Sequence, residues 1–190
     1  GIVIVGDIDV DAVEAKLKTI FADVQKAVNP AERVYYPVAD NKEPIVAIGT
    51  DKEVDDPSIE VYFKQDATPD SEKNNVGYLA SQYMTSMITS MLNARLSELT
   101  QSANPPFTRA YSSYGNFFVA KTKEALNLSA SSKADGIEKA LKVLLQEAER
   151  ARRFGFTESE YARARANYLQ RLESAYNERE KTKHGSYVRE

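Results

Sequence analysis

The chain has 190 residues, of which 42% are hydrophobic and 28% charged, a composition typical of one compact domain rather than of a disordered or fibrous protein. Its net charge of -3 and its pI near 5.4 give no general attraction to phosphate backbones, which argues against a nucleic-acid partner. The absence of cysteine excludes disulfides, thiolate metal ligands and cysteine nucleophiles.

The N-terminal residues predict a strand followed by a helix. Ile2 to Val5 is a β-branched run, and apolar residues then recur at helical spacing from Val10 to Val24. Acidic residues around the first turn, including Asp9, suit the positive end of a helix dipole. Because the chain opens on Gly1 rather than Met and enters the strand directly, we expect it to be a piece of a longer protein. No run approaches the roughly 18 to 20 apolar residues that span a bilayer, so no membrane association is expected.

The middle of the chain predicts a surface connection, two strands and a long helix. Residues 29–44 contain three prolines and no helical period, as expected of a connection. Residues 45–49 and 59–64 have the composition of strands. The pair Thr68-Pro69 provides a capping hydroxyl and a first-turn proline, and a 3.6-residue period then predicts a helix over 69–103.

The last third predicts two strands and two helices. Residues 114–121 and 125–131 show strand patterns, and one apolar stripe predicts a helix from Ile137 that stops near Gly155. The sequence Thr157-Glu158-Ser159-Glu160 is a capping box, so a second helix is expected over 157–178.

This order of elements predicts an α+β fold, in which an antiparallel or mixed β-sheet has its helices, including those at 69–103 and 157–178, packed on one face. We expect residues 1–180 to form one domain and residues 181–190 to begin a linker or a following segment.

The residues needed for metal-dependent or serine-dependent hydrolysis are not found together. Zinc peptidases commonly use two histidines one turn apart, whereas His184 is the one histidine of this chain and is expected in a solvated tail. A serine triad would have to use the same histidine, and no G-x-S-x-G elbow occurs. The sequence therefore predicts neither a zinc site nor a catalytic residue in this chain.

Two charged patterns have structural explanations. The alternating acids that begin at Asp7 resemble half of an EF-hand loop, but Ala12 and Lys18 replace the required glycine and glutamate, so helix capping explains them better. Interleaved glutamates predict an ion-paired, solvated helix face, rather than an anion site, for a basic cluster that comprises Arg150, Arg152, Arg153, Arg163 and Arg165.

Three segments, taken together, resemble the second, non-catalytic domain of insulinase and pitrilysin type zinc metallopeptidases, the inverted zincins. The first is Val5 to Asp9 before an amphipathic helix, and the second is Asn93 to Leu99 on the long helix. The third places Glu147 and Arg150 ahead of the segment Gly155 to Glu160. The resemblance runs in order from about residue 1 to residue 180.

The resemblance implies a parent protein built from homologous domains that close around an unfolded peptide. In such proteins an N-terminal domain bears the H-x-x-E-H zinc ligands and a distal glutamate, and none of these has a counterpart here. A terminal domain of the same type contributes an arginine and, seven positions later, a tyrosine near the zinc. These positions fall on Thr100 and Phe107, which are expected to be substrate-proximal but lack both functional groups.

We therefore expect a non-catalytic structural and substrate-chamber domain of a zinc metallopeptidase that degrades peptides or unfolded proteins, inactive by itself. Its expected partners are a sister domain that bears the zinc and a peptide substrate, in a periplasmic or cell-envelope protein rather than a cytoplasmic one. The alternatives are a binding module or non-catalytic subunit of a heteromeric peptidase-like complex, and an unrelated α+β enzyme with a cleft of perturbed acids.

Overall fold

The computed structural model describes residues 2–54 and 56–188. Two compact units make up the chain, one from Gly1–Val34 with Tyr168–Glu190 and the other from Tyr35–Asn167. The first unit holds α1 (Val10–Ile20), the end of α4 (Glu158–Asn177), a 3-10 turn (Arg179–Lys181) and α5 (His184–Tyr187). The second unit holds the sheet and the polar centres described below.

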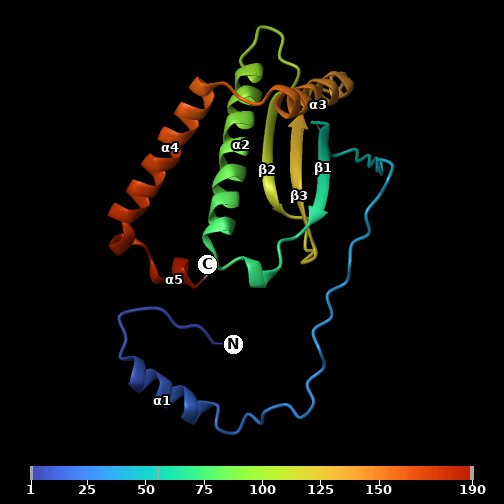
Figure 1. The fold of residues 1–190 in the computed structure, drawn as a ribbon. Helices are drawn as coiled ribbons and strands as arrows, with labels where there is room; N and C mark the ends of the chain where they lie inside the picture. Colours follow the sequence, from blue (N-terminus) through green and yellow to red (C-terminus); the bar gives the residue numbers. More distant parts are fainter. Residues whose placement is uncertain (1, 55, 189–190) are drawn as a thin grey trace. The chain divides into compact units, whose positions relative to one another are not determined.

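The sheet has three antiparallel strands, β1 (Ser58–Asp66), β2 (Arg109–Asn116) and β3 (Lys123–Ser131). The third strand in sequence lies in the centre, which gives the order β1-β3-β2 (Figure 1). Leu128 in the middle of β3 pairs with Val61 of β1 and with Ser112 of β2. The sheet confirms the predicted α+β class and its antiparallel form.

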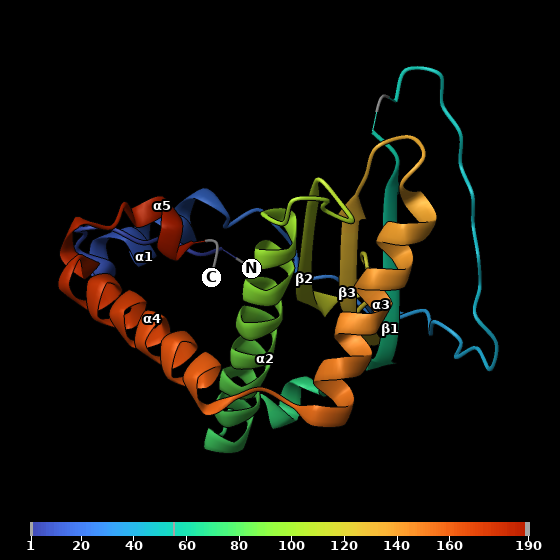
Figure 2. The same ribbon diagram turned by 90° about the horizontal axis from the view of Figure 1, so that it is seen from above.

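Two helices cover one face of this sheet and contact each other there, α2 (Val76–Thr100) and α3 (Ile137–Phe154) (Figure 2). The core between them and the strands consists of Leu92, Leu96, Phe107, Leu128, Ala130, Ala140 and Leu144. The members on each helix are four residues apart and the two members on β3 are two residues apart, as the two geometries require. The first turns of α4 contact α2 through polar side chains, Tyr161 with Tyr83 and Glu160 with Arg95.

Two predicted strands are wrong. Residues 2–5 and 45–49 are irregular, and neither pairs with a strand within residues 2–54 and 56–188. The side chains of Ile45, Val46 and Ile48 are 79%, 78% and 88% exposed. A β-branched run favours a strand only where a neighbouring strand takes up its backbone N–H and C=O groups, and composition does not supply that neighbour.

Two other boundaries differ from the predictions. The long helix begins at Val76, where the side chain of Asn75 accepts from the Tyr78 N–H at 2.9 Å, and a 3-10 turn (Asp70–Glu72) precedes it. The strand predicted at 114–121 is β2, which ends at Asn116. Phe118, two residues later, has a φ of 52°, a left-handed conformation that does not continue a strand.

At the C-terminal end, α5 occupies part of the segment 181–190 that was predicted to begin a linker. The last two residues of that segment, like the first residue of the predicted domain 1–180, lie outside the described residues. The domain boundary at residue 180 stays a prediction. No helix in the described ranges has the length and apolar character that crossing a bilayer requires.

Candidate functional site

Metal-ligating side chains do not gather anywhere in the described part of the chain, where no group of three or more histidines, cysteines or acids could hold an ion. His184 begins the short helix α5. Asp9 is the N-cap of α1, and its carboxylate accepts from the Ala12 N–H at 3.0 Å. This hydrogen bond supports helix capping, rather than calcium binding, as the explanation for the N-terminal acids.

The two positions predicted to be substrate-proximal lie close to the core. Thr100 is the last residue of α2, and its hydroxyl donates to the Ser97 carbonyl at 2.7 Å. Phe107 is only 2% exposed and packs in the core with Leu96 and Leu128. The ring of Phe107 therefore contacts the interior of its own domain. Substrate proximity at these two positions stays a prediction.

The best-connected polar centre joins α2 to the start of α4. Arg95, 8% exposed, donates from Nε to Glu160 Oε1 at 2.5 Å and from Nη2 to Glu160 Oε2 at 2.9 Å. The same Nη2 also donates to the Gly155 carbonyl at 3.1 Å, and the guanidinium lies 4.5 Å from the centre of the Phe156 ring. One buried arginine thus holds the α3–α4 connection against α2 by a bidentate ion pair and a cation–π contact.

Glu160 has a second function at the N-terminus of α4. Its Oε2 accepts from the Thr157 N–H at 2.7 Å, and the Thr157 hydroxyl accepts from the Glu160 N–H at 3.3 Å, which confirms the predicted capping box. The ion pair with Arg95, followed by the hydrogen bonds from Thr157, lowers the pKa of Glu160 to about 2 against the opposing effect of burial. Glu160 is therefore ionised throughout the physiological range and cannot act as a general acid or base there.

A second polar contact closes the outer edge of β2. Asn93 of α2 accepts from the Ser112 N–H at 2.6 Å and donates from its amide to the Ser112 carbonyl at 3.0 Å. These two bonds reproduce what a neighbouring strand would make, so β2 cannot extend the sheet at Ser112. In the sequence, Asn93 and Arg95 stood out only as members of a recurrent segment. In the structure, Asn93 holds β2 against α2 and Arg95 holds the start of α4 against α2.

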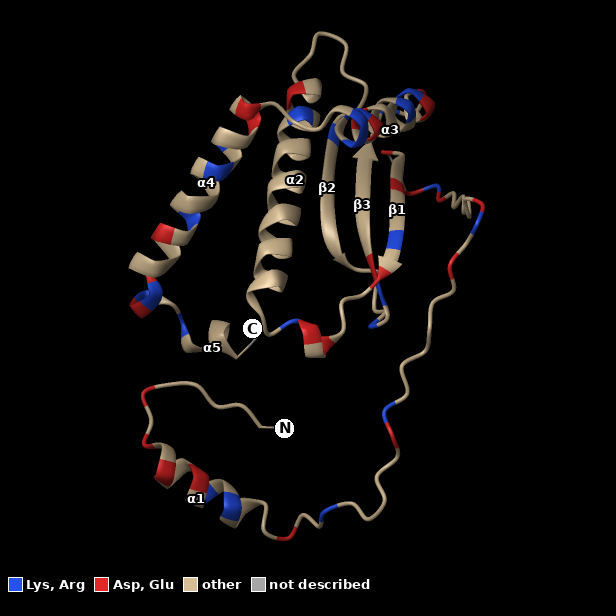
Figure 3. Ribbon diagram, viewed as in Figure 1, with Lys and Arg blue, Asp and Glu red and all other residues tan. Residues whose placement is uncertain are grey.

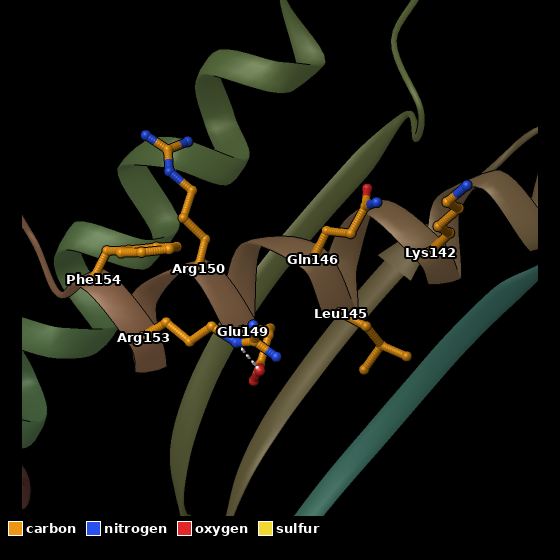
Figure 4. Close-up of a pocket in the computed structure, with 7 residues that line it drawn as sticks. All are labelled: Lys142, Leu145, Gln146, Glu149, Arg150, Arg153 and Phe154. Carbon is orange, nitrogen blue, oxygen red and sulfur yellow. Dashed lines mark hydrogen bonds and ion pairs between the residues drawn. The ribbon is translucent and has the colours of Figure 1, made fainter.

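A shallow depression of about 560 Å³ lies along the outer surface of α3. All of its lining residues come from that one helix, and Phe154, 80% exposed, lies at its end beside Arg150 (Figure 4). Arg153 and Arg152 both pair with Glu149, and Arg150 pairs with Glu147. The alternation of charges along α3 (Figure 3) confirms the predicted ion-paired face for these arginines, and the depression lacks convergent groups from a second element.

Sequence reasoning missed a smaller cavity of about 260 Å³ on the other face of the sheet. Tyr62, Asn127 and Phe118 line it, together with Ser113, Tyr114, Gly115, Asn116 and Ala125. Its aromatic wall continues to Phe117, whose ring lies 4.8 Å from that of Phe118 and 5.6 Å from that of Tyr62. The adjacent phenylalanines Phe117 and Phe118, inside the strand expected at 114–121, were a sequence signal that could have indicated it.

The structure is thus an α+β domain whose main polar centres join its own helices and strands. Residues 2–168 match the family described as the Peptidase M16 inactive domain, and the chain belongs to this family. The match confirms the resemblance to insulinase-type peptidases. No curated protein matches the chain.

Solved structures of proteases share the fold. The first half of the periplasmic protease PqqL from Escherichia coli has a TM-score of 0.75 and 19% identity over 95% of this chain and 38% of its own. The whole PqqL structure has a TM-score of 0.76 and 19% identity, and the match covers 96% of this chain and 20% of PqqL. A predicted insulinase family protease from Yersinia pestis has a TM-score of 0.76 and 11% identity, and the match covers 96% of this chain and 38% of that protein. This chain therefore spans from one fifth to about two fifths of the length of these proteins.

Proposed function

We propose that this chain is the non-catalytic domain of a zinc-dependent endopeptidase, and that it forms part of the wall of a chamber for unfolded peptides. The observation that carries the proposal is the match of residues 2–168 to a domain family described as inactive. The structure supports it, because the buried Arg95–Glu160 pair joins two helices and its carboxylate is held ionised. Such a centre fixes one helix against another by a bidentate pair and takes part in no proton transfer.

The lengths of the structural neighbours indicate what would complete the parent protein. Because this fold occupies 38% of the first half of PqqL, there is room in that half for a sister domain of similar size. We propose that such a sister domain bears the zinc and lies next to this chain. The neighbour described as a periplasmic protease favours a periplasmic or cell-envelope location for the parent.

The complete coding sequence tests this proposal. We expect an H-x-x-E-H motif within about two hundred residues upstream, one domain length. The protein made from the complete coding sequence should retain one zinc ion per chain after dialysis against metal-free buffer, measured by elemental analysis. The 190-residue chain, treated in the same way, should retain none.

The zinc measurement also distinguishes the proposed wall domain from the alternative function, a non-catalytic partner subunit. A complete reading frame without the motif, whose product retains no zinc, would support the partner subunit and contradict the wall domain. Stoichiometric zinc on the 190-residue chain itself would contradict both.

A further inference from the structure

The outer edge of β1 has no neighbouring strand in the part of the chain that the structure describes, because the sheet order is β1-β3-β2. After the last residue of β1, the Ala67 N–H donates to the Thr122 carbonyl at 3.1 Å. Before the first residue, the Pro57 carbonyl accepts from the Ser132 N–H at 3.0 Å. Residues that bond the neighbouring strand alternate in an antiparallel pair, so the odd-numbered residues of β1 bond β3 and the even-numbered ones turn their N–H and C=O groups outward.

The other edge of the sheet is closed in its middle. Both backbone groups of Ser112 on β2 are bonded to the side chain of Asn93. An edge whose backbone groups have no partners can add a strand from another chain, and proteins usually protect such edges. The edge without this protection is that of β1, where the outward groups belong to Ser58, Glu60, Tyr62, Lys64 and Asp66.

A segment of the same chain starts beside one end of this edge. Lys123 of β3, only 5% exposed, donates to Asp40 and to Asp66, the last residue of β1, at 2.7 Å in each case. We call these two ion pairs the clasp, and residues 41–49, which follow it, the strap. Because one buried ammonium group bonds both carboxylates, the clasp holds the start of the strap at the Asp66 end of β1.

The strap then follows the outer side of β1 toward the other end of that strand, as Figure 1 and Figure 2 show. Lys64 of β1 donates to the Ala39 carbonyl at 2.8 Å, just before the clasp. The chain rejoins the sheet at Pro57, directly before β1, so the strap runs antiparallel to β1. Beyond the strap, the Asp51 carboxylate accepts from the Glu53 N–H at 2.9 Å, an Asx turn of the kind that reverses a chain.

The strap has the length and the side chains of a strand. Its nine residues would cover about 30 Å when extended, at about 3.3 Å each, which matches the nine residues of β1. Ile45, Val46 and Ile48 are β-branched, and all three are largely exposed. Pro44 comes directly before them, where the start of an edge strand tolerates a missing N–H. Pairing with β1 would supply the partner strand that these residues lack.

We infer that the strap closes on the outer edge of β1 as a fourth, antiparallel strand, and that the structure shows its open position. Closure pairs the outward groups of β1 with the backbone of the same chain, so β1 no longer accepts a strand from another chain. Opening makes that edge available again, and the clasp keeps the strap next to it. This device belongs to the domain itself and operates whatever the parent protein does.

Amide hydrogen exchange of the isotope-labelled 190-residue chain, followed residue by residue by NMR, tests closure. The amides of Glu60, Tyr62 and Lys64 point away from β3, so a closed strap is what provides their acceptors. We expect these amides to exchange at least about tenfold more slowly than in an unstructured peptide. The amides of Val61 and Phe63 bond β3 and are the internal reference, because their exchange reports the stability of the sheet itself.

Lys123→Met removes the clasp and leaves Asp40 and Asp66 as two acids of like charge without their common partner. Because the start of the strap is then released, the ratio of the exchange rate at Tyr62 to that at Val61 should rise about tenfold. Using this ratio separates opening of the strap from a general loss of stability. Lys121→Met, at an exposed position two residues earlier on the same hairpin, is the matched control and should leave the ratio unchanged.

Proline in the strap tests the same pairing from the other side. Val46→Pro and Ala47→Pro, made separately, remove the N–H groups of two consecutive residues, one of which faces β1 in either register. We expect at least one of the two variants to raise the exchange ratio of Tyr62 to Val61 about tenfold. Val28→Pro is the control, because Val28 is 89% exposed and lies outside the strap.

Three results would overturn the inference. The first is exchange at Glu60, Tyr62 and Lys64 as fast as in an unstructured peptide while Val61 and Phe63 are protected, which would mean that the strap stays open. The second is an equal exchange ratio in the Lys123→Met and Lys121→Met chains. The third is a ratio that neither proline in the strap changes.

Discussion

Replacement of Arg95 by methionine should lower the free energy of unfolding by about 3 kcal/mol, measured by urea denaturation at pH 7. The substitution leaves Glu160, whose side chain is 14% exposed, charged and without its main partner. It also removes the hydrogen bond to the Gly155 carbonyl and the contact with the Phe156 ring. Removal of one member of a buried pair is costly, because the remaining charge keeps its desolvation penalty.

The matched control is Arg152→Met, which breaks a pair with Glu149 on the exposed surface of α3 and should change stability little. The double variant Arg95→Met with Glu160→Leu should regain part of the lost stability, because no unpaired charge is left, and the rest stays lost with the capping bonds from Thr157 to Glu160. Equal losses in the Arg95 and Arg152 variants would contradict the assignment of Arg95 as the packing centre.

The same pair predicts a dependence of stability on pH. The pKa of Glu160 is about 2 in the folded chain against 4.5 for an ordinary glutamate. Because the folded pKa is depressed, the stabilisation is fully present above about pH 4.5 and is lost as the pH falls toward 2. Between pH 4.5 and pH 2 the free energy of unfolding of the unsubstituted chain should therefore fall more than that of the Arg95→Met variant.

Replacement of Phe107 by alanine should cost about 3 to 5 kcal/mol of unfolding free energy, the usual range for a buried aromatic residue. Phe107 is 2% exposed and touches the same core cluster as Leu96 and Leu128, so the cavity left behind cannot be filled by solvent. Phe154→Ala is the control, because that ring is 80% exposed and its loss should change stability by less than about 0.5 kcal/mol.

Phe107→Tyr tests the role of this position more finely. It restores the residue type that the family resemblance expects near a substrate. In this structure it places a hydroxyl in the core, which should cost about 1 to 3 kcal/mol unless the group reaches a partner. If the Phe107→Tyr and Phe107→Ala variants were both as stable as the unsubstituted chain, the ring of Phe107 would not lie in the core as described.

The helices could be predicted because their signals are local. The period of apolar residues and the capping box around Thr157 lie within a few turns of the helix that they specify, and α1, α3 and α4 begin within two residues of expectation. The strands could be predicted only in part, since strand formation needs a partner that is distant in sequence. Residues 45–49 have strand composition without a partner, whereas β2, with the sequence RAYSSYGN, is placed by its pairing with β3.

The polar centres could not be predicted for the same reason. Arg95 and Glu160 are 65 residues apart, and nothing in either local sequence indicates the other. The cavity on the open sheet face needs three strands and a hairpin in register before Tyr62, Asn127 and Phe118 converge. Family resemblance identified the segments that contain Arg95 and Glu160, but only the structure shows that each contributes one member of an ion pair.

The most direct test of the proposed function is peptide cleavage, measured by mass spectrometry on a library of unstructured peptides of mixed length with zinc present. The 190-residue chain alone should give no turnover above background, because it supplies neither the metal that activates water nor a carboxylate poised to take its proton. Turnover should be found with the protein made from the complete coding sequence. Reproducible cleavage by the purified 190-residue chain, abolished by a substitution within it, would contradict the assignment of this chain as a non-catalytic domain.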